Sequence, residues 1–228
     1  MGTSKGYIPP KTIKWSQAKR AVTGFARNGD SDSKAFAVAK FAEAMKSDVQ
    51  SAAISNAVEQ LISFAGHAST VGINNALRDW GREDLIGKSS EEIWSELLNQ
   101  FTNEGASTED YLAADALTGA LEYLQVKQIE ELENISADVL LKEVLIAYIQ
   151  SSFAFRYSEQ IGQGHTPVET KRILDQARGC ISLEIRNTLD MSDINSINYK
   201  NIKDEKIVDK YLQKAWDILI ACYPEVEK

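Results

Sequence analysis

The sequence predicts an all-α protein, in which a single multi-helix globular domain at residues 15–228 follows an extended N-terminal arm at residues 1–14. Apolar residues recur at helical spacing in almost every periodic segment, and no segment shows the sustained alternation of a half-buried strand. The chain has 228 residues, 43% of them hydrophobic, which is enough to bury a core.

The N-terminal segment differs in composition from the rest of the chain. Before Trp15 it holds Gly2, Gly6, Pro9 and Pro10 and almost nothing apolar. Because such a segment has little to bury, it favours an exposed arm over a packed element. The first helical pattern is expected to begin at about Trp15.

Helix start signals divide the remaining chain into successive helices. Ser89 and Glu92 have the spacing of a capping box, and Ser107 or Thr108 is expected to cap the helix that follows. The polar side chain of an N-cap residue satisfies backbone N–H groups that the helix itself leaves unpaired. The expected helices begin near residues 15, 31, 47, 73, 89, 108, 136, 167 and 207.

Loops and one central helix complete the expected architecture. Gly66 is expected to end the third helix, which makes 67–72 a loop of small residues. The helix between Ser136 and Gly162 is apolar on nearly every side, so we expect it to be the most buried element. The polar stretch at about 190–203 is expected to be a loop before the C-terminal helix.

Charge is distributed unevenly along the chain. The net charge is −8, yet no carboxylate occurs before Asp30, so the first 29 residues carry +6 and the remainder carries −14. The acidic remainder disfavours general nucleic-acid binding, whereas the basic front suits phosphates or an acidic partner protein. A solvated basic helix face explains the same pattern. The basic residues of the front are Lys5, Lys11, Lys14, Lys19, Arg20 and Arg27.

The sequence indicates a cytoplasmic protein without a metal site. It contains no apolar run long enough to span a membrane and no secretion signal. Cys180 and Cys222 are far apart in the sequence and are expected to be free thiols. His67 and His165 show no metal-ligand spacing, so neither a metal nor a cofactor is expected.

Motifs for catalysis are absent from the sequence. No phosphate-binding glycine loop, nucleophile elbow or dinucleotide fingerprint occurs, so no catalytic residue is predicted. The acidic pairs 91–92 and 109–110 suit the first turns of helices better than proton transfer. His67 lies near Ser69 and Thr70, but the sequence shows no third group to orient its ring. A hydrolase centred on His67 therefore ranks last among our hypotheses.

The α-amine of Gly2 is the most reactive nitrogen that the sequence offers. A small residue after Met1 permits removal of the initiator methionine, which leaves Gly2 as a free amino terminus. At pH 7 about a tenth of α-amines but only roughly four in ten thousand lysine amines are uncharged, so an acylating enzyme would favour Gly2 by a factor on the order of 100 to 300. The motif for N-myristoylation requires Ser or Thr where this chain has Gly6.

Several short motifs follow one another in a fixed order over most of the chain. They are Met1-Gly2-Thr3-Ser4, Phe64-Ala65-Gly66 through Ile73 and Leu77 to Asp84-Leu85-Ile86-Gly87, Ser90-Glu91-Glu92-Ile93, Gly105, Ser107-Thr108-Glu109-Asp110 and Ala113-Ala114-Asp115-Ala116. Each motif is weak alone, but in their order and spacing they resemble the B-type proteins of Qat anti-phage defence systems.

The resemblance implies an operon with three partners: an ATPase (QatA type), an enzyme similar to QueC of deazaguanine biosynthesis (QatC type) and a TatD-like nuclease (QatD type). QueC-type enzymes activate a 7-deazaguanine carboxylate with ATP and transfer the acyl group to nitrogen. If the amine of Gly2 replaces ammonia, the product is a protein with a deazaguanine on its N-terminus. Gly2, Thr3 and Ser4 are then the residues that the enzyme recognises.

The leading hypothesis is a non-enzymatic defence component that is modified at Gly2 and whose helical body is a scaffold for partner proteins. The alternative is a nucleic-acid adaptor that presents DNA to the nuclease through the basic front. Its expected contacts are Lys11, Lys14, Lys19, Arg20 and Arg27, and Lys5 lies in the same basic region.

Overall fold

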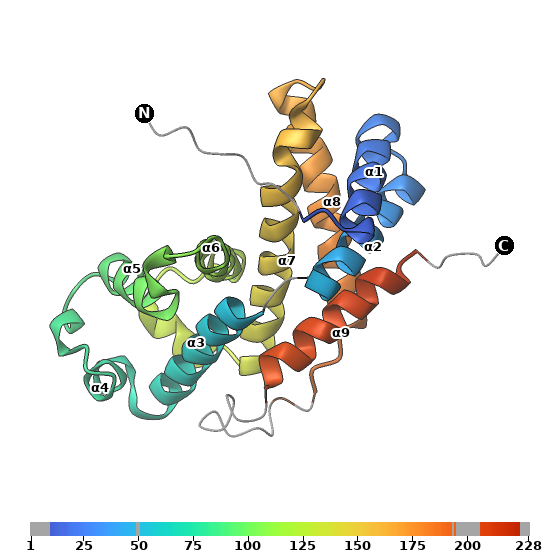
Figure 1. Cartoon of the computed structure of the whole chain (residues 1–228). Coiled ribbons are helices and arrows are strands. Elements are labelled where there is room, and N and C mark those ends of the chain that lie inside the picture. Colours follow the sequence, from blue (N-terminus) through green and yellow to red (C-terminus); the bar gives the residue numbers. More distant parts are fainter. Residues whose placement is uncertain (1–9, 49–50, 193, 195–205, 224–228) are drawn as a thin grey trace. The chain divides into compact units, whose positions relative to one another are not determined.

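The computed structural model describes residues 10–48, 51–192, 194 and 206–223, and within them the fold is all-α, as predicted. No strand occurs among these residues. Short 3-10 helices connect longer elements at Glu83–Leu85, Asn103–Gly105 and Ile129–Asn134. The α-helices (Figure 1) are α1 Ile13–Asn28, α2 Ser31–Asp48, α3 Ala52–Val71, α4 Ile73–Asp79, α5 Ser90–Phe101, α6 Thr108–Tyr123, α7 Ala137–Gly162, α8 Pro167–Thr188 and α9 Ile207–Ala221.

Contacts divide the chain into two compact units. The first unit consists of residues 1–49, 149–189 and 213–228, and the second of residues 50–148 and 190–212. Helices α7 and α9 therefore contribute residues to both units. Each unit has a core of its own.

The first unit is built around an aromatic cluster. The ring of Phe41 on α2 packs edge-on against Phe153 and Tyr157 of α7 and against Trp216 of α9, at centroid distances of 5.2, 5.9 and 5.9 Å. Such edge-to-face pairs stabilise a core beyond the burial of their area. Helix α1 packs against α2 with buried residues that include Phe25.

The second unit has a separate aromatic cluster. Phe64 of α3 packs against Trp80, which follows α4, and both rings lie near Phe101 at the end of α5. A carboxylate fixes the start of α4, because Glu133 Oε1 accepts a hydrogen bond of 2.9 Å from the backbone N–H of Ile73. The cluster and this cap hold the short helix α4 against the unit.

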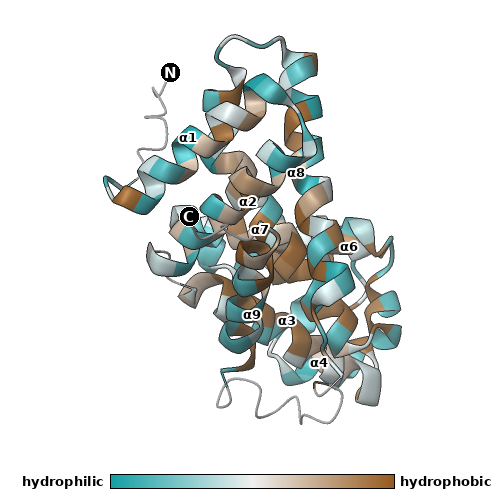
Figure 2. Cartoon of the chain, turned by 90° about the vertical axis from the view of Figure 1, so that its right-hand side faces the viewer, coloured by the Kyte–Doolittle hydropathy of each residue, from teal (hydrophilic) through white to brown (hydrophobic). Residues whose placement is uncertain are grey.

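Helix α7 is buried along most of its length, in agreement with its apolar sequence. Much of it is brown in Figure 2, and its exposed residues are limited to Val139, Phe155, Ser158 and Glu159. It begins at Ala137, directly after the expected start, and ends at Gly162. The sequence therefore predicted both ends of this helix.

The prediction of a loop at 67–72 is wrong, because α3 continues to Val71. Gly66 lies inside the helix, and its carbonyl accepts hydrogen bonds from the hydroxyls of Ser69 and Thr70. Ala68 is fully buried, so packing favours the additional turn. The helix ends instead at Gly72, whose φ of 82° is a conformation that glycine adopts readily. Of the expected loop at 190–203, residues 193 and 195–203 lie outside the described residues.

Candidate functional site

The residues proposed for modification lie outside the described part of the chain. These are Gly2, Thr3 and Ser4, and the same holds for Lys5. The described chain starts at Pro10, and the three residues from Pro10 to Thr12 are exposed. The hydroxyl of Thr12 accepts a hydrogen bond from the backbone N–H of Trp15, so Thr12 is the N-cap of α1.

Helix α1 has one buried and one exposed face. Its buried residues are Trp15, Ala18, Ala21, Val22 and Phe25, which recur at helical spacing. Trp15 is only 2% exposed, and the guanidinium of Arg156 lies 5.9 Å from its ring centroid. Trp15 therefore anchors the start of α1 in the first unit.

The opposite side of α1 forms an open depression of about 530 Å³. Gln160 of α7 lies beside it and donates hydrogen bonds to the Lys19 carbonyl oxygen, at 2.9 Å, and to Thr23 Oγ1, at 2.8 Å. These two bonds join Lys19 and Thr23 of α1 to α7. The lining residues of the depression are Ser16, Lys19, Arg20, Thr23, Gly24 and Arg27. We call this surface the basic face of α1.

The cations of the basic face have no acidic partner among the described residues. Lys19, Arg20 and Arg27 are exposed, and none of them forms an ion pair with a carboxylate in the described part of the chain. The same is true of Lys11 and Lys14, which lie at the start of α1. The first turn of α1 contains no acidic residue, and the positive end of the helix dipole adds to the local potential. The structure thus brings three sequence-predicted cations together on one surface.

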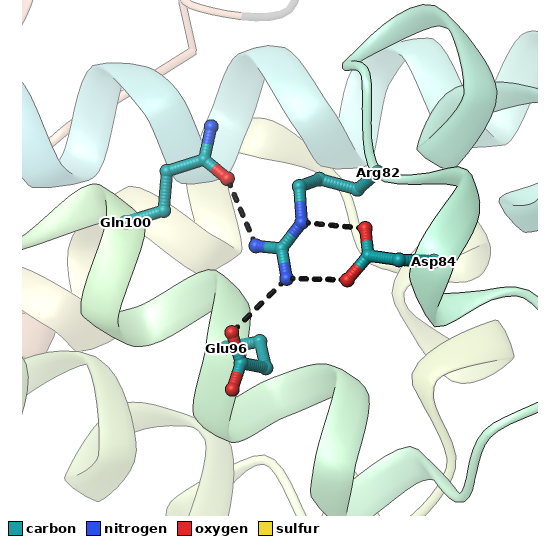
Figure 3. Close-up of polar contacts among 4 residues, drawn as sticks. All are labelled: Arg82, Asp84, Glu96 and Gln100. Carbon is teal, nitrogen blue, oxygen red and sulfur yellow. Dashed lines mark hydrogen bonds and ion pairs between the residues drawn. The ribbon is translucent and has the colours of Figure 1, made fainter.

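Arg82 of the second unit, unlike the cations of the basic face, is paired with carboxylates of the described chain. Its guanidinium donates to both carboxylate oxygens of Asp84, at 3.0 and 3.1 Å, and to Glu96 Oε2 at 3.0 Å (Figure 3). A further bond of 3.3 Å joins it to Gln100 Oε1. Arg82 lowers the pKa of Asp84 through these hydrogen bonds, and the two carboxylates raise the pKa of Arg82. This cation is satisfied within the protein, whereas no described carboxylate pairs with the cations of the basic face.

The candidate catalytic residues have structural partners. The His67 ring lies 2.8 Å from Asp79 Oδ2, a partner that the sequence did not reveal because the two residues belong to different helices. The hydroxyls of Ser69 and Thr70 bond to a backbone carbonyl of their own helix. Nothing in this arrangement aligns His67 with a nucleophile, as acyl transfer would require.

One member of each acidic pair caps a helix. Glu92 and Asp110 each accept hydrogen bonds from the N-cap serine three residues earlier, Ser89 and Ser107, in complete capping boxes. These bonds lower the pKa of both carboxyl groups. The prediction that 91–92 and 109–110 favour capping is confirmed at Glu92 and Asp110.

Cysteines and metal ligands add no further site to the described residues. Cys180 and Cys222 are half-buried thiols, and burial raises the pKa of Cys180 and raises that of Cys222 to about 12. Within the described ranges, no group of three His, Cys, Asp or Glu side chains is arranged to hold a metal ion. None of the helices described has both the length and the apolar character that crossing a membrane requires.

Comparison with known protein families gives a match over most of the chain. The family model described as QatB, Qat anti-phage system associated protein, matches residues 42–219. No curated protein and no solved structure matches the chain. The match includes helices α3 to α8 in full and leaves α1 and the arm outside its limits.

Proposed function

This chain belongs to the QatB family of Qat anti-phage system associated proteins, and we propose that it serves the system as a non-enzymatic component. In this proposal a QueC-like partner enzyme recognises Gly2, Thr3 and Ser4 and conjugates a 7-deazaguanine to Gly2. The helical body is a scaffold for partner proteins, among them the ATPase and the TatD-like nuclease.

The proposed reaction forms an amide. The partner activates the carboxylate of the 7-deazaguanine with ATP, and the uncharged α-amine of Gly2 attacks the carbonyl carbon. A C–N bond forms, the bond to the activating group breaks, and the leaving group departs with its electron pair while the amine loses a proton. The lower basicity of an α-amine relative to lysine favours Gly2 at neutral pH.

The observation that carries this proposal is the place where the described chain begins. Pro10, Lys11 and Thr12 are exposed, and Ile13, the first residue of α1, is 79% exposed. A segment attached at this point starts at the surface of the first unit. The point at which the arm joins α1 is therefore open to a second protein.

The non-enzymatic role is supported by how polar side chains are used. Glu92 and Asp110 cap helices, and Arg82 joins a loop to α5. His67 pairs with Asp79 at the surface. Glu92, Asp110 and His67 each have a partner that explains their position without a reaction.

A nucleic-acid adaptor is the second candidate function. Its support is the set of exposed cations on and before α1, Lys11, Lys14, Lys19, Arg20 and Arg27, which lack acidic partners among the described residues. Contacts of this kind neutralise phosphates, so their affinity decreases steeply as the salt concentration rises. The acidic remainder of the chain counts against this candidate.

Intact mass spectrometry tests the conjugation. When the chain is produced together with an active QueC-like partner, we expect its mass to increase by one deazaguanine acyl group. Gly2→Val should abolish the increase, because a branched side chain next to the amine hinders attack while valine still permits removal of Met1. Gly6→Val is the matched control, since it makes the same substitution without changing the terminal amine.

No mass change in the presence of an active partner would remove the conjugation and leave the scaffold role. An unchanged mass increase in Gly2→Val would show that another nitrogen is modified, and peptide mapping would locate it.

A further inference from the structure

We propose that the basic face of α1 is the docking surface for an acidic surface of the enzyme that acylates Gly2. This inference rests on the proposed function, and it adds the place where the partner binds. Lys19, Arg20 and Arg27 supply the charge, and the depression between them receives acidic side chains of the partner.

The three cations form no ion pair with the described part of the protein. No carboxylate of the described chain pairs with them, whereas Arg82 has two carboxylate partners. Arg27 lies in the last turn of α1, where a cation interacts favourably with the negative end of the helix dipole. Lys19 and Arg20 lie in the interior of the helix and have no such role. Their side chains are therefore free to engage the carboxylates of another protein, which arginine binds in bidentate geometry.

The position of the basic face matches the position of the reacting amine. Gly2 precedes Thr12 by ten residues, and a fully extended chain of that length spans at most about 36 Å. Thr12 is the N-cap of α1, so the arm and the basic face belong to consecutive parts of the chain. An enzyme bound to α1 would hold its active site within reach of Gly2 and raise the local concentration of the amine.

Two features favour an acidic protein over a nucleic acid. From Lys19 to Arg27 the face extends 8 residues, or about 12 Å along the helix, which suits a compact cluster of carboxylates. A duplex is stiff over about 150 base pairs and would extend beyond this face, next to a chain whose remaining residues carry −14. The aromatic residues of α1, Trp15 and Phe25, are buried and cannot stack on bases.

The test measures the affinity of the purified partner enzyme for the full chain, without ATP and at several salt concentrations. Lys19→Glu/Arg20→Glu should weaken binding at least about tenfold, and wild-type binding should weaken as salt rises. Lys19→Gln/Arg20→Gln should give an intermediate loss. The matched control is Lys171→Glu/Arg172→Glu, the same dipeptide at exposed positions of α8, which should change the affinity by less than about twofold.

An unchanged affinity of Lys19→Glu/Arg20→Glu, or an equal loss in the control, would overturn the docking surface. The proposal would also be overturned if a short DNA duplex bound the wild type but not Lys19→Glu/Arg20→Glu, while the enzyme bound both proteins equally well. The mass of the chain after reaction separates the two proposals. If Lys19→Glu/Arg20→Glu weakens enzyme binding but the wild-type chain gains no mass, only the conjugation is overturned. If the wild-type chain gains mass but the substitutions leave enzyme binding unchanged, only the docking surface is overturned.

Discussion

At the scale of single residues, burial and bonding partners distinguish cations that stabilise the fold from cations that could bind another molecule. The side chain of Arg82 is only 18% exposed and bonds to three neighbours, Asp84, Glu96 and Gln100. Arg78, four residues earlier, is 53% exposed, pairs with Glu83 at 3.3 Å and donates a hydrogen bond of 2.8 Å to Asn75 Oδ1. A network around a partly buried guanidinium stabilises more than contacts of an exposed one, which water screens.

We therefore expect Arg82→Ala to lower the free energy of unfolding by about 1 kcal/mol, because it removes the network and leaves its partners unmatched. Arg78→Ala, the matched control, should change it by less than about 0.5 kcal/mol. Urea denaturation followed by circular dichroism measures both. Equal losses in the two variants would contradict the structural role of Arg82.

At the scale of elements, N-terminal caps determine where several helices begin. Complete capping boxes start α5, α6 and α8, and in each the acidic residue has a lowered pKa: Glu92, Asp110 and Glu169. A carboxyl group with a lowered pKa in the folded state stabilises it at neutral pH. That contribution is lost as the pH falls through the pKa of the folded state.

The cap of α6 provides a test of this account, because the sequence left Ser107 and Thr108 as alternatives. Ser107 Oγ accepts the backbone N–H of Asp110 and donates to its carboxylate at 2.6 Å. Ser107→Ala should cost about 1 kcal/mol of unfolding free energy at pH 7, and Thr108→Ala, at an exposed position, less than about 0.5 kcal/mol.

The Ser107 hydroxyl is the main cause of the lowered pKa of Asp110. The difference between wild type and Ser107→Ala should therefore shrink as the pH falls below about 4, where Asp110 becomes protonated in the unfolded and then in the folded chain. Chemical denaturation at a series of pH values measures this difference. A difference that is constant down to pH 2 would argue against the charged cap.

At the scale of the whole molecule, the arm and the body are expected to be separable. The buried residues of the described chain begin at Trp15, and we expect that neither core requires residues 2–9. A chain without residues 2–9 should keep its helix content and its thermal midpoint, and the partner enzyme should no longer increase its mass. Removal of residues 2–28 is the control, and it should destabilise the first unit because it deletes the buried side chains of α1. A lower midpoint after removal of residues 2–9 alone would show that the arm packs into the body and would weaken the case for Gly2.

The sequence by itself determined the helical fold, most helix boundaries and the charge asymmetry, because helical spacing, capping residues and composition are local properties. Its error at 67–72 arose because Gly66 resembles a helix end, whereas the burial of Ala68 depends on distant residues. Only the tertiary structure decided which charges are paired. Asp79 reaches His67, Glu96 reaches Arg82, and no described carboxylate reaches Lys19 or Arg20, because such pairs depend on how helices pack together.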